Sequence, residues 1–214
     1  MTDPESPRQR ILDAALEGFA ESGYEGASLQ RVADRAGLHK SSLFHHFRSK
    51  EELAREVYRG LAERLLKRLE PLLAEDPPRL ESLLVALEAS ADHFAAEPAS
   101  ARLLMRLLVT TRQTGGASSD RDDPFATPIG QVDAIDRVLW GVGAWLARAR
   151  AAGAIRPVPV RHTVLNLMGL VLFYPAVLHH IAPDRLAADP RAPEVLSSRK
   201  RELRRFLEAA LAPR

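Results

Sequence analysis

Polar and aromatic side chains gather in the stretch HKSSLFHHFRSK, which ends at Lys50. If a helix begins near the first histidine of this stretch, four of these side chains share one face, because helical residues three and four positions apart are neighbours. They are Lys40, Ser41, Phe44 and His45. This face combines hydrogen-bond donors with an aromatic body. Such a mixture suits the major groove of DNA, where base edges accept hydrogen bonds and thymine methyl groups offer apolar contact.

Leu43 and Phe47 lie on the opposite side of the same short helix, which we predict at about 39–46. They need an apolar surface to pack against, since an amphipathic helix buries its apolar stripe. Two preceding helices can supply that surface. The first is predicted at about 7–22, and the second, shorter one ends near Gly37. Gly37 can adopt the left-handed conformation that a bend of three or four residues requires.

A longer helix is predicted after these three. Ser49 and Glu52 have the spacing of a capping box, which marks the beginning of a helix. We expect this helix to run to about residue 70 and to end at Pro71. Three short helices around a glycine turn, followed by a long one, are the outline of a helix-turn-helix domain. We place this domain at 7–53, with the long helix as its link to the rest of the chain.

Beyond residue 76 no segment alternates as a strand would, and apolar residues recur with helical spacing. We therefore predict an all-α protein, in which an N-terminal three-helix domain is joined by a long helix to a C-terminal helical domain over 76–214. The C-terminal helices are expected at about 78–96, 98–113, 128–152, 158–181 and 193–212. The polar, glycine-rich stretch 114–130 is expected to be a long loop.

Basic residues are concentrated in one short segment. Residues 28–50 hold five basic and one acidic side chains, although the formal net charge of the whole chain is only +2. A basic segment in a nearly neutral protein indicates contact with a polyanion. Anionic lipid is the alternative to nucleic acid, but a lipid-binding helix would be continuous, with lysines opposite bulky apolar residues. This segment is broken into two short helices, so the pattern favours nucleic acid over a membrane surface.

The composition excludes several classes of protein. Cysteine is absent, which excludes disulfides, thiol catalysis and cysteine-bound zinc. The first residues lack the apolar run of a secretory signal, so we expect a cytoplasmic protein. The apolar stretch Val164–Leu178 is shorter than the roughly 18–20 residues that a membrane span needs. We expect it to belong to a core or interface helix and expect no membrane partner.

The run GASLQRVADRAGLHKSSLFHHFRSKEEL resembles the DNA-binding domain of the TetR family of bacterial regulators. Several ordered positions carry the resemblance. They are Ser28, Val32-Ala33, Ala36-Gly37-Leu38, the stretch from Leu43 to Phe47, Lys50 and Leu53. Three positions depart from the family pattern: His39 replaces a serine or threonine cap, Ser41 a glycine, and Phe44 a tyrosine. The last change removes a hydroxyl that would bind a phosphate.

The resemblance implies a regulator that binds double-stranded operator DNA, and favours a repressor released by a small-molecule effector. It implies that residues at the start of the second helix approach the DNA backbone and bases, and that His46 and Lys50 hold phosphates. Together with the exposed face of the third helix, this gives nine candidate DNA contacts. They are Ser28, Gln30, Lys40, Ser41, Ser42, Phe44, His45, His46 and Lys50.

The resemblance also implies a homodimer. The helices at about 158–181 and 193–212 would pair with their mates as a four-helix bundle; the alternative is that both merely complete a monomer core. Polar or aromatic residues within apolar helices are the candidates for an effector pocket. They are His93, Phe94, Met105, Trp140, Trp145, His162, Asn166, Phe173 and Tyr174. A mainly aliphatic and aromatic lining would indicate an apolar or amphipathic effector.

An enzyme is the main alternative, and the sequence gives little support for one. Motifs of serine hydrolases, zinc proteases and phosphate-binding loops are absent. Gly141 and Gly143 imitate the start of a dinucleotide-binding fingerprint, but no strand precedes them. We expect them to permit close helix packing instead. His45 and His46 point about 100° apart on a helix, with no third ligand evident, so we expect neither a metal ion nor a cofactor.

Overall fold

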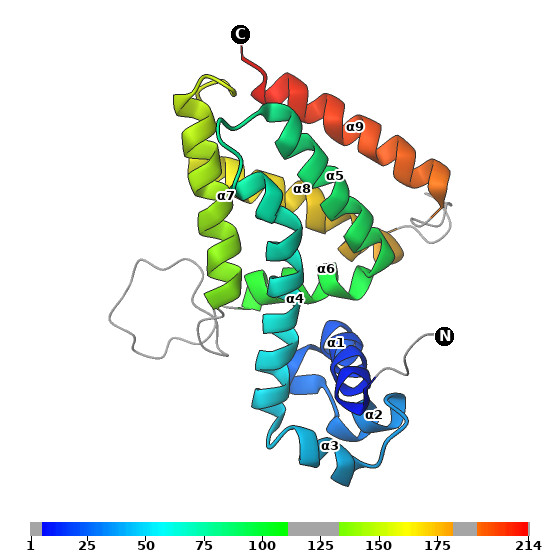
Figure 1. The fold of residues 1–214 in the computed structure, drawn as a ribbon. Coiled ribbons are helices and arrows are strands. Elements are labelled where there is room, and N and C mark those ends of the chain that lie inside the picture. Colours follow the sequence, from blue (N-terminus) through cyan, green and yellow to red (C-terminus); the bar gives the residue numbers. More distant parts are fainter. Residues whose placement is uncertain (1–5, 111–132, 182–191, 214) are drawn as a thin grey trace.

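The computed structural model describes residues 6–110, 133–181 and 192–213 (Figure 1). Throughout these ranges the regular elements are helices, which confirms the predicted all-α class. The helices are α1 (Pro7–Gly26), α2 (Leu29–Arg35), α3 (Lys40–His46), α4 (Lys50–Leu73), α5 (Leu80–Ala96), α6 (Pro98–Thr110), α7 (Asp133–Ala151), α8 (Val160–Ile181) and α9 (Pro193–Leu211). The predicted loop 114–130 lies outside the described residues, as does the beginning of the helix predicted at 128–152.

The first two helices begin where the sequence predicts. The Ser6 hydroxyl accepts a hydrogen bond from the backbone N–H of Gln9 at 3.2 Å, which caps α1. Gly23 has a φ of 72°, so it bends the chain, but the helix resumes and reaches Gly26 instead of ending at residue 22. Ser28 occupies the position before α2, yet its side chain makes no capping hydrogen bond. Its hydroxyl is exposed and accessible to another partner.

The long helix α4 begins at the predicted cap and ends later than predicted. The Ser49 hydroxyl accepts from the backbone N–H of Glu52 at 3.1 Å. The expectation that Pro71 ends α4 was wrong, because the helix continues through this residue to Leu73. The missing N–H of a proline removes only one bond so close to the end of a helix. Arg148 of α7 donates to the carbonyl oxygen of Leu73 at 2.9 Å, so a distant side chain supports this last turn.

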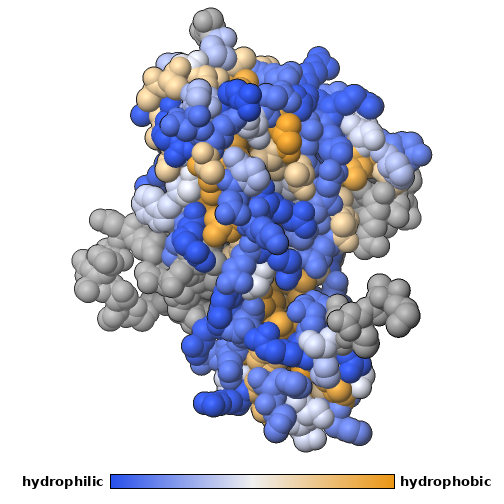
Figure 2. Space-filling view, in the orientation of Figure 1, coloured by the Kyte–Doolittle hydropathy of each residue, from blue (hydrophilic) through white to orange (hydrophobic). Residues whose placement is uncertain are grey.

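The helices form two groups along α4. In Figure 1, α1, α2 and α3 surround its N-terminal end, while α5, α7, α8 and α9 surround its C-terminal end. Helix α6 lies between the groups and packs against both α1 and α8. Helix α9 packs along α5, at the end of the molecule farthest from α3. The face shown in Figure 2 is mostly hydrophilic, with apolar residues confined to small patches.

Helix α8 is apolar over an unusual length. By length and composition alone, its window Val160–Val177 could cross a membrane, with a mean hydropathy of 1.3. In the structure this helix packs against α5, α6 and α7, and 39% of the window is buried within the protein. Core and interface helices share this composition, so the property does not by itself indicate a membrane span.

Close packing between α4 and α7 depends on one glycine. A Cβ atom added at Gly141 would lie 2.9 Å from Cδ1 of Leu73, which is closer than carbon atoms pack. At Gly143 the nearest side-chain atom, Cγ1 of Val160, would be 3.8 Å away. The predicted close approach is therefore real at Gly141, and Gly143 has room for a methyl group.

We predict opposite effects of alanine at these two glycines. Gly143→Ala should stabilise the protein by about 0.5–1 kcal/mol, because alanine loses less backbone entropy in a helix. Gly141→Ala must displace Leu73, so we expect a net loss of about 1 kcal/mol. Denaturant unfolding of both variants measures the difference. A Gly141→Ala variant as stable as Gly143→Ala would show that α7 does not press on α4 at this point.

Candidate nucleic-acid interface and ligand cavity

Helix α3 is held by an apolar core shared with α1, α2 and the start of α4. Leu43 and Phe47 are 0% and 1% exposed, as predicted, and belong to the same buried cluster as Ile11 and Phe19 of α1. Gly37 forms the turn between α2 and α3 with a φ of 67°. Because both buried side chains of α3 are fixed, the opposite face of the helix has a defined orientation.

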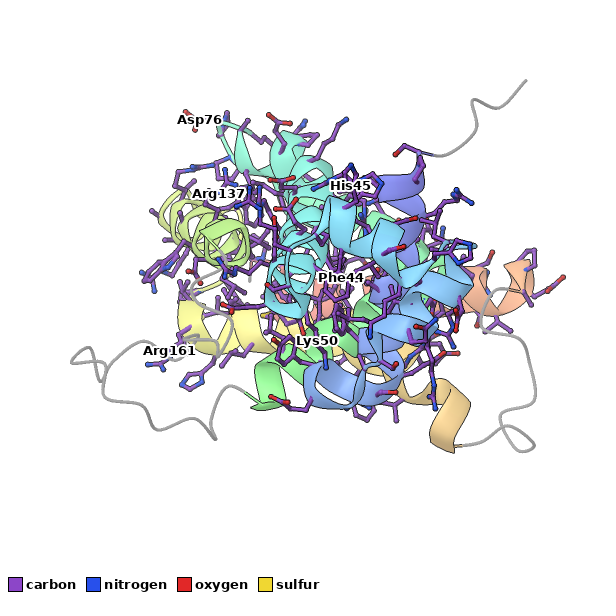
Figure 3. All side chains as sticks on the ribbon, turned by 90° about the horizontal axis from the view of Figure 1, so that it is seen from below. Phe44, His45, Lys50, Asp76, Arg137 and Arg161 are labelled. Atoms are coloured by element: carbon purple, nitrogen blue, oxygen red, sulfur yellow. The ribbon has the colours of Figure 1, made fainter. Side chains whose placement is uncertain are left out.

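That opposite face is exposed at one end of the molecule. Lys40, Ser41, Phe44 and His45 are all exposed, and Phe44 keeps 43% of its surface accessible. Figure 3, seen from this end, shows Phe44 and His45 on α3 in front of the other helices. The Lys40 ammonium lies 5.9 Å from the centre of the Phe44 ring, so a positive charge accompanies the aromatic surface. The arrangement can offer donors and an apolar contact to a DNA groove.

The remaining predicted contacts flank this face. Ser28, Gln30 and His46 are exposed, whereas Ser42 is half-buried. The side-chain amide of Gln30 donates to Asp34 at 2.9 Å, one turn along α2. This bond leaves the amide oxygen of Gln30 available to a partner. For all of these residues, DNA contact stays a prediction.

Lys50 has a structural partner that the sequence did not predict. Its ammonium donates to the backbone carbonyl of Glu25 at 3.0 Å and lies 5.0 Å from the centre of the Tyr24 ring. These contacts join the start of α4 to the end of α1. An ammonium has three donors, so Lys50 can hold this junction and still donate to a phosphate.

The histidine pair on α3 does not converge on a shared point. The rings of His45 and His46 have centroids 6.2 Å apart and planes 80° apart. Within the described ranges, no group of three His, Cys, Asp or Glu side chains is placed to hold a metal ion.

An apolar cavity of about 100 Å³ lies among α4, α5, α6, α7 and α8. Its walls are almost entirely aliphatic, with one aromatic ring and one hydroxyl. Representative lining residues are Leu65, Leu69, Phe94, Leu104, Val138, Val142, Leu167 and Val171. The hydroxyl, of Ser90, donates to the backbone carbonyl of Ala86 at 2.8 Å. The cavity therefore suits a hydrocarbon surface, and it offers no charged group to a ligand.

Of the nine residues predicted to line an effector pocket, this cavity includes Phe94. Four others lie outside the cavity lining, on α5, α6, α7 and α8. Trp145 is fully buried, His93 is buried beside Phe94, and Met105 and Tyr174 are half-buried. The aliphatic residues that line the cavity were not singled out, because any apolar helix position could equally be ordinary core.

Four of the residues predicted for an effector pocket are exposed and do not line this cavity. Trp140 is 75% exposed on α7. His162, Asn166 and Phe173 share one face of α8, as their spacing predicted, and that face is exposed. The cavity-facing positions of α8 lie on its other side. They are Val164, Leu167, Met168, Val171 and Leu172.

The exposed face of α8 continues onto α9 as an apolar surface. Leu165, Phe173 and Phe206 are 44%, 53% and 58% exposed. The opposite side of α9 is tied to α5, because Arg204 pairs with Glu88 at 2.7 Å and with Glu81 at 2.8 Å. These two carboxylates raise the pKa of Arg204 well above its usual range. The ion pairs fix α9 with Phe206 directed outward.

Helix α6 connects the cavity to the group formed by α1, α2 and α3. Leu104 and Leu107 line the cavity from α6. On the same helix, Arg106 donates to the backbone carbonyls of Ala20 and Glu21 at 3.0 and 2.9 Å. These carbonyls belong to the last straight turns of α1, before the bend at Gly23. A shift of α6 would therefore be transmitted to α1.

Comparison with known proteins places these features in context. A sequence profile described as "Bacterial regulatory proteins, tetR family" matches residues 11–57. The HTH-type transcriptional repressor AcnR of Corynebacterium efficiens is 39% identical over 95 residues, which cover 41% of this chain and 50% of AcnR. The chain spans about half the length of the curated relatives it matches.

Two solved structures resemble the whole fold. The ketosteroid transcriptional regulator KstR2 of Mycobacterium tuberculosis has a TM-score of 0.71 at 20% identity, covering 99% of this chain and 98% of that one. FadR from Bacillus subtilis, solved in complex with stearoyl-CoA, has a TM-score of 0.62 at 18% identity, covering 92% and 96%. The matched profile spans most of α1, all of α2 and α3, and the start of α4, so this segment is similar to the bacterial regulatory proteins of the tetR family.

Proposed function

We propose that this protein is a sequence-specific DNA-binding transcriptional regulator, and that it acts as a repressor which a small-molecule effector releases from its operator. One observation carries the proposal: the exposed Lys40–Phe44 face of α3, backed by a buried core, lies within the residues that match a DNA-binding family. The relatives AcnR and KstR2 carry the name of transcriptional repressors. The protein would act by binding rather than by catalysis, in the cytoplasm, where bacterial DNA lies.

We further propose a division of labour along the chain. Residues 7–53 would form the DNA-binding domain, with α4 as the link, and residues 76–214 the effector-binding and dimerisation domain. The effector would be apolar or amphipathic, since the cavity walls are almost wholly aliphatic. Stearoyl-CoA, the ligand in the FadR complex, has a long hydrocarbon chain of this kind.

The size of the cavity suggests how an effector would release DNA. Ligand pockets usually measure about 300–1,000 Å³, whereas this cavity measures about 100 Å³. An effector of ordinary size must push the surrounding helices apart. Because α6 lines the cavity and its Arg106 binds α1, expansion would displace the DNA-binding helices. Ligand binding would then favour a dimer whose two α3 helices no longer match the groove spacing.

A homodimer would bring two α3 helices to two operator half-sites. The exposed face of α8 and α9, with Leu165, Phe173 and Phe206, is the surface that a second copy would cover. His162 and Asn166 on the same face would supply polar contacts to the partner. The surface lies far from α3 in Figure 1, so pairing leaves the DNA-binding face free.

Selection of fragments from the source genome tests the proposed function directly. The full chain, without added ligand and in low salt, should enrich a few short sequences over random duplex. The enriched fragments should contain an inverted repeat, because a two-fold dimer reads two symmetric half-sites. If no genomic fragment competes better than random duplex, the regulator proposal fails.

We predict that Lys50→Ala weakens binding to selected and random DNA by a similar factor. Loss of one phosphate contact should also reduce the slope of log affinity against log salt concentration by about one. Gel-shift titrations at several salt concentrations measure both effects. Lys67→Ala, at an exposed position near the C-terminal end of α4, is the matched control, because α3 precedes the N-terminal end of that helix. An unchanged slope for Lys50→Ala would remove this residue from the DNA contacts.

A charge in the apolar face of α8 should prevent dimerisation. Phe173→Glu would bury an unpaired carboxylate in the interface, so we expect a monomer of 23.6 kDa in sedimentation at micromolar concentration. Operator affinity should fall with it, because a single half-site is bound weakly. Trp140→Glu, which changes an even more exposed aromatic residue on α7, should leave the dimer intact. A dimeric Phe173→Glu variant would exclude this face as the interface.

A further inference from the structure

A polar cluster lies beside the apolar cavity, at the junction of α4, α5 and α6. It consists of Arg64 and Arg68 from α4, His93 and Glu97 from the end of α5, and Ser100 from α6. None of these side chains lines the cavity itself, but their neighbours do. In the sequence of α4, Arg64 directly precedes Leu65 and Arg68 directly precedes Leu69, and both leucines line the cavity. The centre of the His93 ring lies 5.0 Å from that of Phe94.

The contacts of His93 fix which of its nitrogens can donate. Arg68 Nη2 lies 3.3 Å from His93 Nδ1. A guanidinium only donates hydrogen bonds, so Nδ1 must accept, and the proton of the neutral ring is on Nε2. The side chain of His93 is 6% exposed, and in the described part of the chain Nε2 has no hydrogen-bond partner. A buried N–H donor is thus left without an acceptor, which is costly.

Acceptors are scarce throughout this cluster. Glu97 is its one carboxylate; it pairs with Arg64 at 3.5 Å, accepts from the Ser100 hydroxyl, and stands 3.8 Å from His93 Nε2. Among the described carboxylates, none forms an ion pair with Arg68. Burial and the positive charges of Arg68 and Arg64 lower the pKa of His93. The cluster therefore has two permanent positive charges, one negative charge and a surplus of donors.

We propose that the effector is an amphipathic acid, whose hydrocarbon part enters the cavity and whose anionic group, a carboxylate or phosphate, is bound by Arg64 and His93 Nε2. The anion takes the place of the Glu97 carboxylate, which is 34% exposed and can turn to solvent. This inference rests on the proposed function, and it adds the chemical class of the effector. It also accounts for two features at once, a cavity without charged groups and a donor-rich cluster beside it.

Matched probes test the proposal by isothermal titration calorimetry on the full chain. Dodecanoate, dodecyl phosphate and dodecanol share one hydrocarbon chain and differ in the head group. We expect both acids to bind about tenfold or more tightly than the alcohol, which is the gain of one charge-assisted hydrogen bond to an anion. A preference for only one acid would identify the carboxylate or the phosphate as the natural group.

Three variants test which side chains cause the preference for the acids over dodecanol. Arg64→Gln should reduce the affinity for the acids to that for dodecanol, with dodecanol unaffected. Glu97→Gln removes the competing anion, so affinity for the acids should rise several-fold, a change that a misfolded variant could not produce. Lys67→Gln removes an exposed positive charge of α4 that is not part of the cluster, and should leave all three affinities unchanged.

The outcomes separate this inference from the proposed function. Dodecanol binding as tightly as the acids, no binding of any probe, or an acid preference that survives Arg64→Gln would each overturn the inference. Enrichment of genomic DNA by the same preparation would leave the regulator proposal standing in those cases. Conversely, acid binding that depends on Arg64 in a protein without DNA preference would overturn the proposed function alone.

Discussion

The continuity of α4 is the constraint on which the rest of this structure depends. Its N-terminal half supplies Leu53 and Leu61 to the buried core that includes α1 to α3. Its C-terminal half supplies Leu65, Leu69 and Leu72 to the wall of the cavity. An unbroken helix keeps its two ends in a fixed relation, so a movement of the cavity wall would also shift α1 to α3. In the proposed function, α4 is therefore the element that couples effector binding to DNA binding.

A second connection adds to that coupling. Arg106 reaches from α6 to two backbone carbonyls of α1, and Arg102 pairs with Glu17 of α1 at 3.4 Å. Charge-assisted bonds to backbone carbonyls hold position better than apolar contact, which permits sliding. Expansion of the cavity between α4 and α6 would thus act on α1 through both helices.

The helix-turn-helix could be predicted from the sequence because its signals are local. Gly37 marks the turn, and the helical spacing of Leu43 and Phe47 determines which side chains are buried. The cavity could not be predicted in this way, since its walls come from five helices that only the tertiary fold brings together. His162 and Phe173 show what helical periodicity can and cannot predict. It correctly placed both residues on one face of a helix, but it did not predict that this face is exposed. Which face looks inward depends on residues far away in the chain.

The cavity and the donor-rich cluster are both costs to the unliganded fold, and they lie side by side along α4. An apolar cavity of about 100 Å³ destabilises a protein by about 2 kcal/mol at the usual cost per unit volume. The unpartnered N–H of His93 adds a penalty of about 1–3 kcal/mol. A ligand that fills the cavity and accepts a hydrogen bond from His93 Nε2 would recover both of these free-energy costs. In the proposed function, this recovered free energy would be available to displace α4 and α6 and so to weaken DNA binding.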